Sequence, residues 1–148
     1  MEHVLPMLTQ QATAARDREA ARLQQARQSH AQAQATLQRL EAFRQECLAR
    51  SPAATGGRGD GATLAAYQQF VARLDEAIAM QRQETGLRAN QADAQQQRLA
   101  QAQQRLLAFQ ALANRQAVRA AQRETKREQR MADEFAARAT ARAQEPFA

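Results

Sequence analysis

The stretch LAAYQQFVARLDEAI, Leu64 to Ile78, decides the fold class of this chain. Its larger apolar residues alternate spacings of three and four, which is the seam of a coiled-coil helix. The alternation continues through polar residues without slipping, so we predict a single long helix over about 63–143. Its seam is Leu64, Tyr67, Val71, Leu74, Ile78, Gln81, Thr85, Arg88, Ala92, Gln95, Leu99, Ala102, Leu106, Phe109 and Ala113.

A first helix with the same pattern is predicted over about 6–50. Pro6 lies in its first turn, where a missing backbone N–H is harmless. Between Ala15 and Leu23 the pattern needs one extra step of four residues, which is a stutter rather than a break. The seam of this helix is Leu5, Leu8, Ala12, Ala15, Leu23, Ala26, His30, Ala33, Leu37, Leu40, Arg44 and Cys47.

The stretch between the two helices, RSPAATGGRGDGAT at 50–63, contains Pro52 and four of the five glycines. We predict a connector over about 51–62. One connector between two such helices makes an antiparallel hairpin, in which residue i faces about residue 112 − i. The predicted fold is therefore all-α: one coiled-coil domain over 1–148, built as a long two-helix antiparallel hairpin.

The second helix should extend beyond the first. At 1.5 Å per residue, helices of about 45 and 80 residues are roughly 68 Å and 120 Å long. The segment over about 112–143, called the overhang below, then has no partner helix within the chain.

The composition favours such an extended helical protein over a globular domain. Of 148 residues 44% are hydrophobic, but 37 of these are Ala, which leaves only 28 larger apolar side chains for a core. The middle of the hairpin should be soft, because Gln81, Arg88 and Gln95 occupy the seam. Gly86 adds about 1 kcal/mol of helix penalty, so we expect bending or fraying there.

No catalytic or metal-binding group emerges from the sequence. His3 and His30 lack cysteine or carboxylate neighbours at metal-ligand spacing. The sequence GGRGDG lacks the Lys-Ser/Thr ending of a phosphate loop, and Cys47 on the seam is a small buried hydrophobe. We therefore predict a protein that is not an enzyme and has no cofactor, no metal and no small-molecule substrate.

A cytoplasmic location is expected for this chain. Its lone cysteine excludes an internal disulfide and suits a reducing compartment. The N-terminal stretch lacks the pattern of a signal peptide, and no apolar run approaches the length that spans a membrane.

The overhang contains the stretch REQRMADEFAARATAR, 127–142, in which Met131 and Phe135 stand among charges. Ion pairs of Glu134 with Arg130 and Arg138 should support this helix. The two apolar side chains lie roughly a third of a turn from a basic stripe, and they would be exposed unless another protein covers them. We interpret them as a docking patch. The basic stripe is Arg119, Arg123, Lys126 and Arg130.

The net charge of +6, from 21 basic and 15 acidic residues, leaves two other functions open. One is a helical protein that binds nucleic acid through the basic stripe, although the stripe has no interleaved aromatic residues and acidic residues interrupt it. The other is a stand-alone structural dimer in which two hairpins pair through their overhangs.

Two segments resemble the FliJ family, the coiled-coil proteins of the bacterial flagellar type III export apparatus. They are YQQFVARLDEAIAMQRQE, Tyr67 to Glu84, and RLLAFQALANRQAVRAAQRETKREQRMADEFAARATAR, Arg105 to Arg142. The likeness spans nearly the whole chain. It implies an export chaperone or adaptor in flagellar biogenesis and protein transport, located in the cytoplasm and peripherally associated with the export gate at the inner membrane.

The resemblance also implies partners and contact residues. The partners are the export ATPase FliI with its regulator FliH, the cytoplasmic domain of the export gate FlhA, and unloaded export chaperones. The gate-contact residues would be Leu40, Phe43, Cys47, Phe70, Leu74, Ala77 and Gln81, of which Phe43 and Phe70 lie just off the seam. The ATPase-contact residues would be Arg119, Arg123, Lys126, Arg127, Arg130, Met131 and Phe135.

Overall fold

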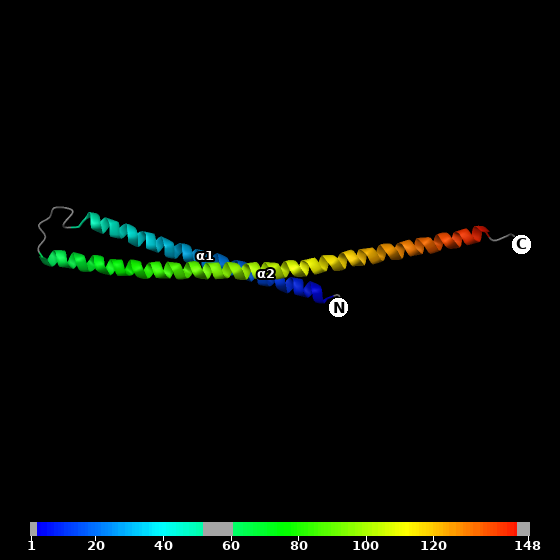
Figure 1. The fold of residues 1–148 in the computed structure, drawn as a ribbon, viewed down its shortest axis with the longest axis horizontal. Coiled ribbons are helices and arrows are strands. Elements are labelled where there is room, and N and C mark those ends of the chain that lie inside the picture. The colour runs from blue at the N-terminus through cyan, green and yellow to red at the C-terminus, as the bar shows by residue number, and fades with distance from the viewer. Residues whose placement is uncertain (1–2, 52–60, 145–148) are drawn as a thin grey trace. The chain divides into compact units, whose positions relative to one another are not determined.

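In a computed structural model the chain folds into two α-helices, and the structure describes residues 3–51 and 61–144 (Figure 1). Helix α1, Val4–Ala49, has 46 residues, and helix α2, Gly61–Gln144, has 84. Within the described ranges there is no strand. The predicted all-α fold, with two helices of which the second is longer, is confirmed. Most of the predicted connector, residues 52–60, lies outside the described residues.

The helix bounds follow from the sequence at the N-terminus of α1. The structure begins α1 two residues before Pro6. The proline therefore stays within the first turn, where the four leading N–H groups have no intrahelical acceptor.

The contacts divide the chain into two units, each described by itself. The hairpin unit, Ala14–Ala102, joins the greater part of α1 to the first half of α2. The terminal unit combines Met1–Thr13 with Gln103–Ala148. Each unit therefore contains a segment of α1 and a segment of α2.

Hydrogen bonds between the helices define the register of the hairpin unit. Tyr67 Oη donates to the Cys47 carbonyl at 3.1 Å, Gln81 Nε2 to the Ala33 carbonyl at 3.1 Å, and Gln95 Nε2 to the Glu19 carbonyl at 3.2 Å. The residue numbers of each pair add up to 114, against the predicted 112. The antiparallel pairing is confirmed, and its register differs from the prediction by two residues.

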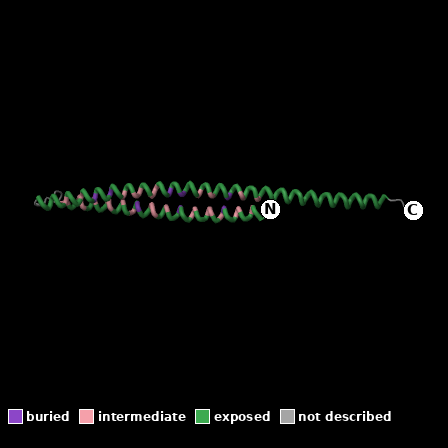
Figure 2. The backbone as a smooth tube through the Cα atoms, turned by 90° about the horizontal axis from the view of Figure 1, so that it is seen from below, coloured by how far each residue is buried: buried purple, intermediate pink, exposed green. Residues whose placement is uncertain are grey.

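The core follows the predicted seams, and Figure 2 shows the buried and intermediate residues where α1 and α2 face each other. Every predicted seam residue is buried or half-buried except Leu64, which is 41% exposed. The register places Leu64 opposite Arg50, just after the end of α1, so no helix covers it. The buried hydrophobic residues are Ala12, Leu23, Ala33, Leu74, Ile78, Ala92 and Leu106.

The polar middle of the seam does not interrupt the helix. Helix α2 runs unbroken through 81–97, and Gln95 is the one buried polar residue among those described. A Cβ on Gly86 would meet nothing within 4 Å, so this glycine makes no close contact that only a glycine would allow. Bending or fraying at this point stays a prediction.

Candidate partner-binding surfaces

Two aromatic rings, one from each helix, meet near the predicted turn of the hairpin unit. The ring centroids of Phe43 and Phe70 lie 6.1 Å apart with an interplanar angle of 84°, an edge-to-face pair. The side chains are 47% and 46% exposed. Because neither residue belongs to the seam, nearly half of each residue's surface is available to another protein.

A shallow groove of about 230 Å³ lies beside this pair, and we call it the tip groove. Glutamate and arginine side chains contribute charge to an otherwise largely apolar lining. The groove therefore suits a mainly apolar ligand side chain with polar flanks. The lining residues are Phe43, Glu46, Cys47, Arg50, Tyr67 and Phe70.

Tyr67 connects this groove to the end of α1. The last four carbonyls of a helix have no intrahelical N–H partner. In α1 the carbonyl of Cys47 accepts the Tyr67 hydroxyl, and that of Glu46 accepts the Arg50 N–H at 3.2 Å. Tyr67 thus caps α1 while its ring lines the groove, so the groove is positioned by the same bond that completes the helix.

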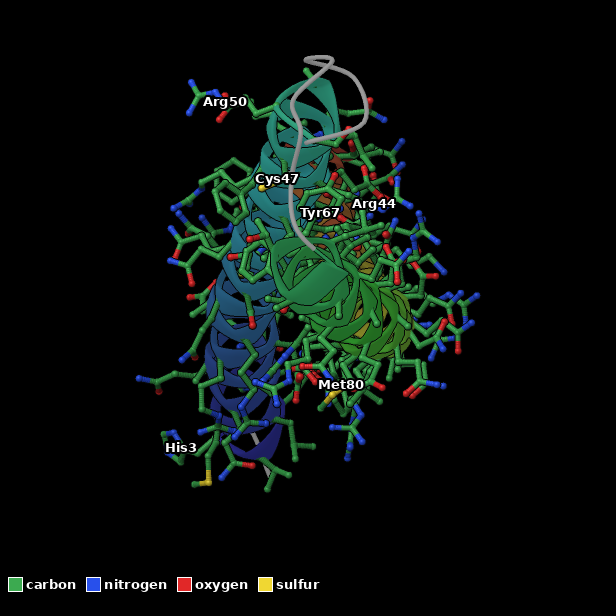
Figure 3. The ribbon with its side chains drawn as sticks, turned by 90° about the vertical axis from the view of Figure 1, so that its left-hand side faces the viewer. His3, Arg44, Cys47, Arg50, Tyr67 and Met80 are labelled. Carbon is green, nitrogen blue, oxygen red and sulfur yellow. The ribbon has the colours of Figure 1, made fainter. Side chains whose placement is uncertain are left out.

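Two ion pairs join the helices on the other flank of the seam. Arg44 pairs with Asp75, and Arg82 Nη2 lies 3.2 Å from Glu41 Oε1. At 100° per residue these side chains fall on the side away from Phe43 and Phe70. Figure 3 shows Arg44 and Cys47 pointing to opposite sides near the end of α1.

The hydrogen bond that Arg44 donates to the Asp75 carboxylate, followed by the negative charge of that carboxylate, raises the pKa of Arg44 above its ordinary value. A raised pKa stabilises the fold at every pH below the ordinary value of the group, and this contribution is lost only as the pH rises beyond it. For an arginine that range is strongly alkaline. The Arg44 guanidinium therefore adds no pH dependence near neutrality.

The seven gate-contact residues expected from the family resemblance do not share one environment. Phe43, Phe70 and Ala77 are exposed, whereas Leu74 is 8% exposed and belongs to the core. Leu40, Cys47 and Gln81 are half-buried, and Gln81 already donates to the Ala33 carbonyl. The residues that the structure brings together in the tip groove are Phe43, Cys47 and Phe70; Leu40, Leu74, Ala77 and Gln81 lie outside its lining.

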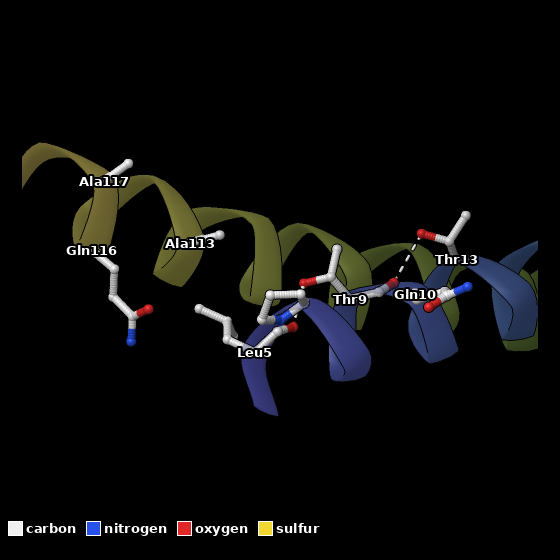
Figure 4. A pocket seen from close by; sticks show the side chains of 8 residues that line it. Leu5, Thr9, Gln10, Thr13, Ala113, Gln116 and Ala117 are labelled. Atoms are coloured by element: carbon white, nitrogen blue, oxygen red, sulfur yellow. Dashed lines mark hydrogen bonds between the residues drawn. The ribbon is translucent and has the colours of Figure 1, made fainter. Parts of the chain in front are cut away.

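The terminal unit has a groove of its own, of about 630 Å³, which we call the terminal groove (Figure 4). The hydroxyls of Thr9 and Thr13 donate to the carbonyls of Leu5 and Thr9, each at 2.9 Å, so these hydroxyls are satisfied by α1 itself. The groove is consequently more apolar than its residue types suggest. Its lining is Leu5, Pro6, Thr9, Gln10, Thr13, Ala113, Gln116 and Ala117.

Beyond this groove the described part of α2, 118–144, is exposed at every residue. Met131 is 63% and Phe135 is 76% exposed. The predicted ion pairs of Glu134 with Arg130 and Arg138 were wrong: no ion pair forms in the described part of α2 after residue 88. Water solvates these long side chains well enough that holding them in one geometry gains little. All the expected ATPase-contact residues are exposed: Arg119, Arg123, Lys126, Arg127, Arg130, Met131 and Phe135.

The described residues contain no group of three or more His, Cys, Asp or Glu that could hold a metal ion. In the same ranges neither helix has a stretch apolar and long enough to cross a membrane.

Comparison with known proteins identifies the family. A family model described as Flagellar FliJ protein matches residues 1–145 of the 148. The chain belongs to the FliJ family. The comparison with curated proteins found no match, and neither did the comparison with solved structures.

Membership of the FliJ family gives the chain a role in flagellar export. The match includes both grooves, because it covers nearly all of the chain. Sequence reasoning about this FliJ family member missed three functional or structural groups: the capping role of Tyr67, the Arg44 partner Asp75, and Glu19, which accepts from Gln95. Glu19 could have been found, because it stands at the extra four-residue step between Ala15 and Leu23.

Proposed function

We propose that this FliJ family member is a non-enzymatic adaptor that links the export ATPase FliI, with its regulator FliH, to the export gate FlhA, and that it also handles unloaded export chaperones. The carrying observation is the half-exposed pair of Phe43 and Phe70, which two helices hold together beside a groove. Exposed aromatic residues on a rigid element are common anchors of protein interfaces. In this proposal the protein works in the cytoplasm, peripherally associated with the inner-membrane gate.

The gate surface is assigned to the tip groove side of the hairpin unit. Two ion pairs connect the helices on the other flank. The aromatic pair is therefore not needed to hold the helices together and is free to contact a partner. Leu74, however, is buried and would act through packing rather than by touching the gate.

The ATPase surface is assigned to the exposed part of α2 in the terminal unit. Its basic residues would guide an acidic partner surface into place, and Met131 and Phe135 would supply the apolar contact. FliH and the unloaded chaperones are included because the family resemblance implies them.

Binding of two purified partners tests the proposal. We expect Phe43→Ala with Phe70→Ala to weaken binding to the cytoplasmic domain of FlhA at least tenfold while circular dichroism keeps its helical signal. Met80→Ala with Leu87→Ala is the control, because these apolar side chains are 71% and 51% exposed on α2, the helix of Phe70, and lie outside the tip groove. Equal loss in both variants, or no gate binding by the unmodified chain, refutes the gate assignment.

The ATPase arm uses Met131→Ser with Phe135→Ser, and Leu107→Ser serves as its control because Leu107 is 62% exposed in the same unit. We expect the double variant alone to lose FliI binding. Sedimentation of the unmodified chain accompanies this arm. If it sediments as a dimer that only the double variant disrupts, and FliI does not bind, the exposed segment is a self-association surface and the ATPase assignment fails.

A further inference from the structure

Two glutamines in the seam of α2 make the same contact with α1. Gln81 Nε2 donates to the carbonyl of Ala33 at 3.1 Å, and Gln95 Nε2 donates to the carbonyl of Glu19 at 3.2 Å. Gln95 follows Gln81 by two heptads, and Ala33 follows Glu19 by two heptads. Both bonds are therefore satisfied by one and the same alignment of the helices.

Gln95 has a second acceptor, because its amide also donates to the Glu19 carboxylate. Gln95 is only 8% exposed, and the Glu19 side chain is 21% exposed. A buried amide that lost these acceptors would leave a donor without a partner, which is costly in a low-dielectric core. The contact of Gln95 with Glu19 therefore favours this alignment of the helices over others.

The apolar part of the seam discriminates poorly between alignments. Sliding one helix by a heptad restores the same faces, and small residues such as Ala33 and Ala92 tolerate a new neighbour. Gln95 discriminates better, because its amide also donates to the Glu19 carboxylate, and that acceptor is specific to one position of α1. A slip of one heptad puts Gln81 opposite Leu40 or Ala26 instead of Ala33, and a slip in either direction takes Gln95 away from Glu19. A single polar seam residue is known to specify register in coiled coils.

We propose that Gln81 and Gln95 are positioning residues that fix the register of the hairpin. Through the register they hold Phe43 against Phe70 and Tyr67 on the carbonyl of Cys47. A slip of one heptad moves a helix by about 10 Å, which would separate the Phe43 and Phe70 rings, whose centroids are 6.1 Å apart. The consequence for partner binding, though not the register itself, rests on the proposed function.

Cross-linking of paired cysteines measures the register directly. All variants carry Cys47→Ala and Glu41→Cys. The second cysteine is placed at Arg82, whose Nη2 lies 3.2 Å from Glu41 Oε1 in the present register. In two further variants it is placed one heptad to either side instead, as Asp75→Cys or Ala89→Cys. A short bismaleimide should link positions 41 and 82 about fivefold faster than either slipped pair, the ratio expected from one net hydrogen bond.

Gln81→Met with Gln95→Met removes the donors at nearly constant volume, and we expect the cross-linking preference to fall severalfold while the thermal midpoint holds or rises. The control is Gln83→Met with Gln97→Met, which are exposed and have the same two-heptad spacing. An unchanged preference in the seam variant overturns the proposal. So does loss of its folded signal with the control intact, because the amides would then supply stability rather than register.

A separate binding arm tells the two proposals apart. It uses Gln95→Met alone, since Gln81 belongs to the expected gate-contact set. Weaker binding of this variant to the FlhA cytoplasmic domain is the expected result, and unchanged binding despite a slipped cross-link pattern refutes the link between register and docking. If the unmodified chain fails to bind the gate while the cross-links still depend on the glutamines, the proposed function fails and the register inference stands.

Discussion

At the scale of single residues, Tyr67 and Leu74 show how structural and functional roles divide in the hairpin unit. Tyr67 completes the end of α1 through its hydroxyl and lines the tip groove with its ring. Leu74 was expected at the gate from the family resemblance but is one of the buried core residues. The two roles can be separated, because the hydroxyl and the ring are removed by different substitutions.

Tyr67→Phe should lower the free energy of unfolding by about 1 kcal/mol, because the Cys47 carbonyl loses the one side-chain donor that it has in the structure. The ring remains, so the tip groove keeps its shape and gate binding should change by less than twofold. Urea denaturation followed by circular dichroism measures the first effect, and a binding titration the second. A large loss of binding with unchanged stability would contradict the capping role.

Leu74→Ala should lower the free energy of unfolding by about 2–5 kcal/mol, the usual cost of truncating a buried leucine. Leu87→Ala is the matched control, because Leu87 is 51% exposed on the same helix and should cost well under 1 kcal/mol. Thermal or urea unfolding measures the loss of stability in each of the two variants. Equal effects of the two substitutions would mean that Leu74 is not packed against α1 in solution.

The sequence was sufficient to predict which residues form the seam, because a helical period of three and four determines which side chains face the partner helix. It was not sufficient to place Asp75 beside Arg44 or Glu19 beside Gln95. Those pairs lie at the edges of the seam, where partners depend on the register to within one or two residues. The predicted register differed from the observed one by that amount.

At the scale of elements, the middle of α2 combines a continuous helix with a weak core. Its seam there is polar, and Gly86 faces open space. The hydrogen bonds of Gln81, and of Thr85 to the Gln81 carbonyl at 2.8 Å, satisfy the polar groups without adding apolar contact. Local opening should therefore begin in this region of the hairpin unit.

Amide hydrogen exchange tests this expectation: residues 81–97 should exchange faster than residues 64–78. Gly86→Ala should slow exchange in the first range and raise the free energy of unfolding by about 0.5–1 kcal/mol, because the added Cβ meets nothing within 4 Å and alanine favours the helix. Ala79→Gly, an exposed position outside the polar middle, should have the opposite effect on stability. Equally slow exchange in the two ranges would show that the polar seam is as firm as the apolar one.

At the scale of the whole molecule, two candidate surfaces occur in separate units of one chain. The tip groove belongs to the hairpin unit, and the exposed end of α2 belongs to the terminal unit. The helices themselves need nothing from residues beyond Ala117, since no later described residue is buried or lines the terminal groove. Such a separation of the two surfaces suits the proposed adaptor, because binding at one surface can be abolished without affecting binding at the other.

Truncation after Ala117 should therefore spare the fold and the gate while abolishing ATPase binding. The thermal midpoint of the remaining chain should shift by no more than about 2–4 °C, the range that 1 kcal/mol causes in chains of this size. The removed segment carries the whole basic stripe, so FliI binding by the full chain should also weaken as salt rises. Truncation after Leu112 makes a useful second variant. It removes Ala113, Gln116 and Ala117 from the terminal groove and should loosen the start of α1, measured as faster hydrogen exchange over residues 3–13. A chain truncated after Ala117 that still binds FliI at full strength would mean that the exposed end of α2 is not the ATPase surface.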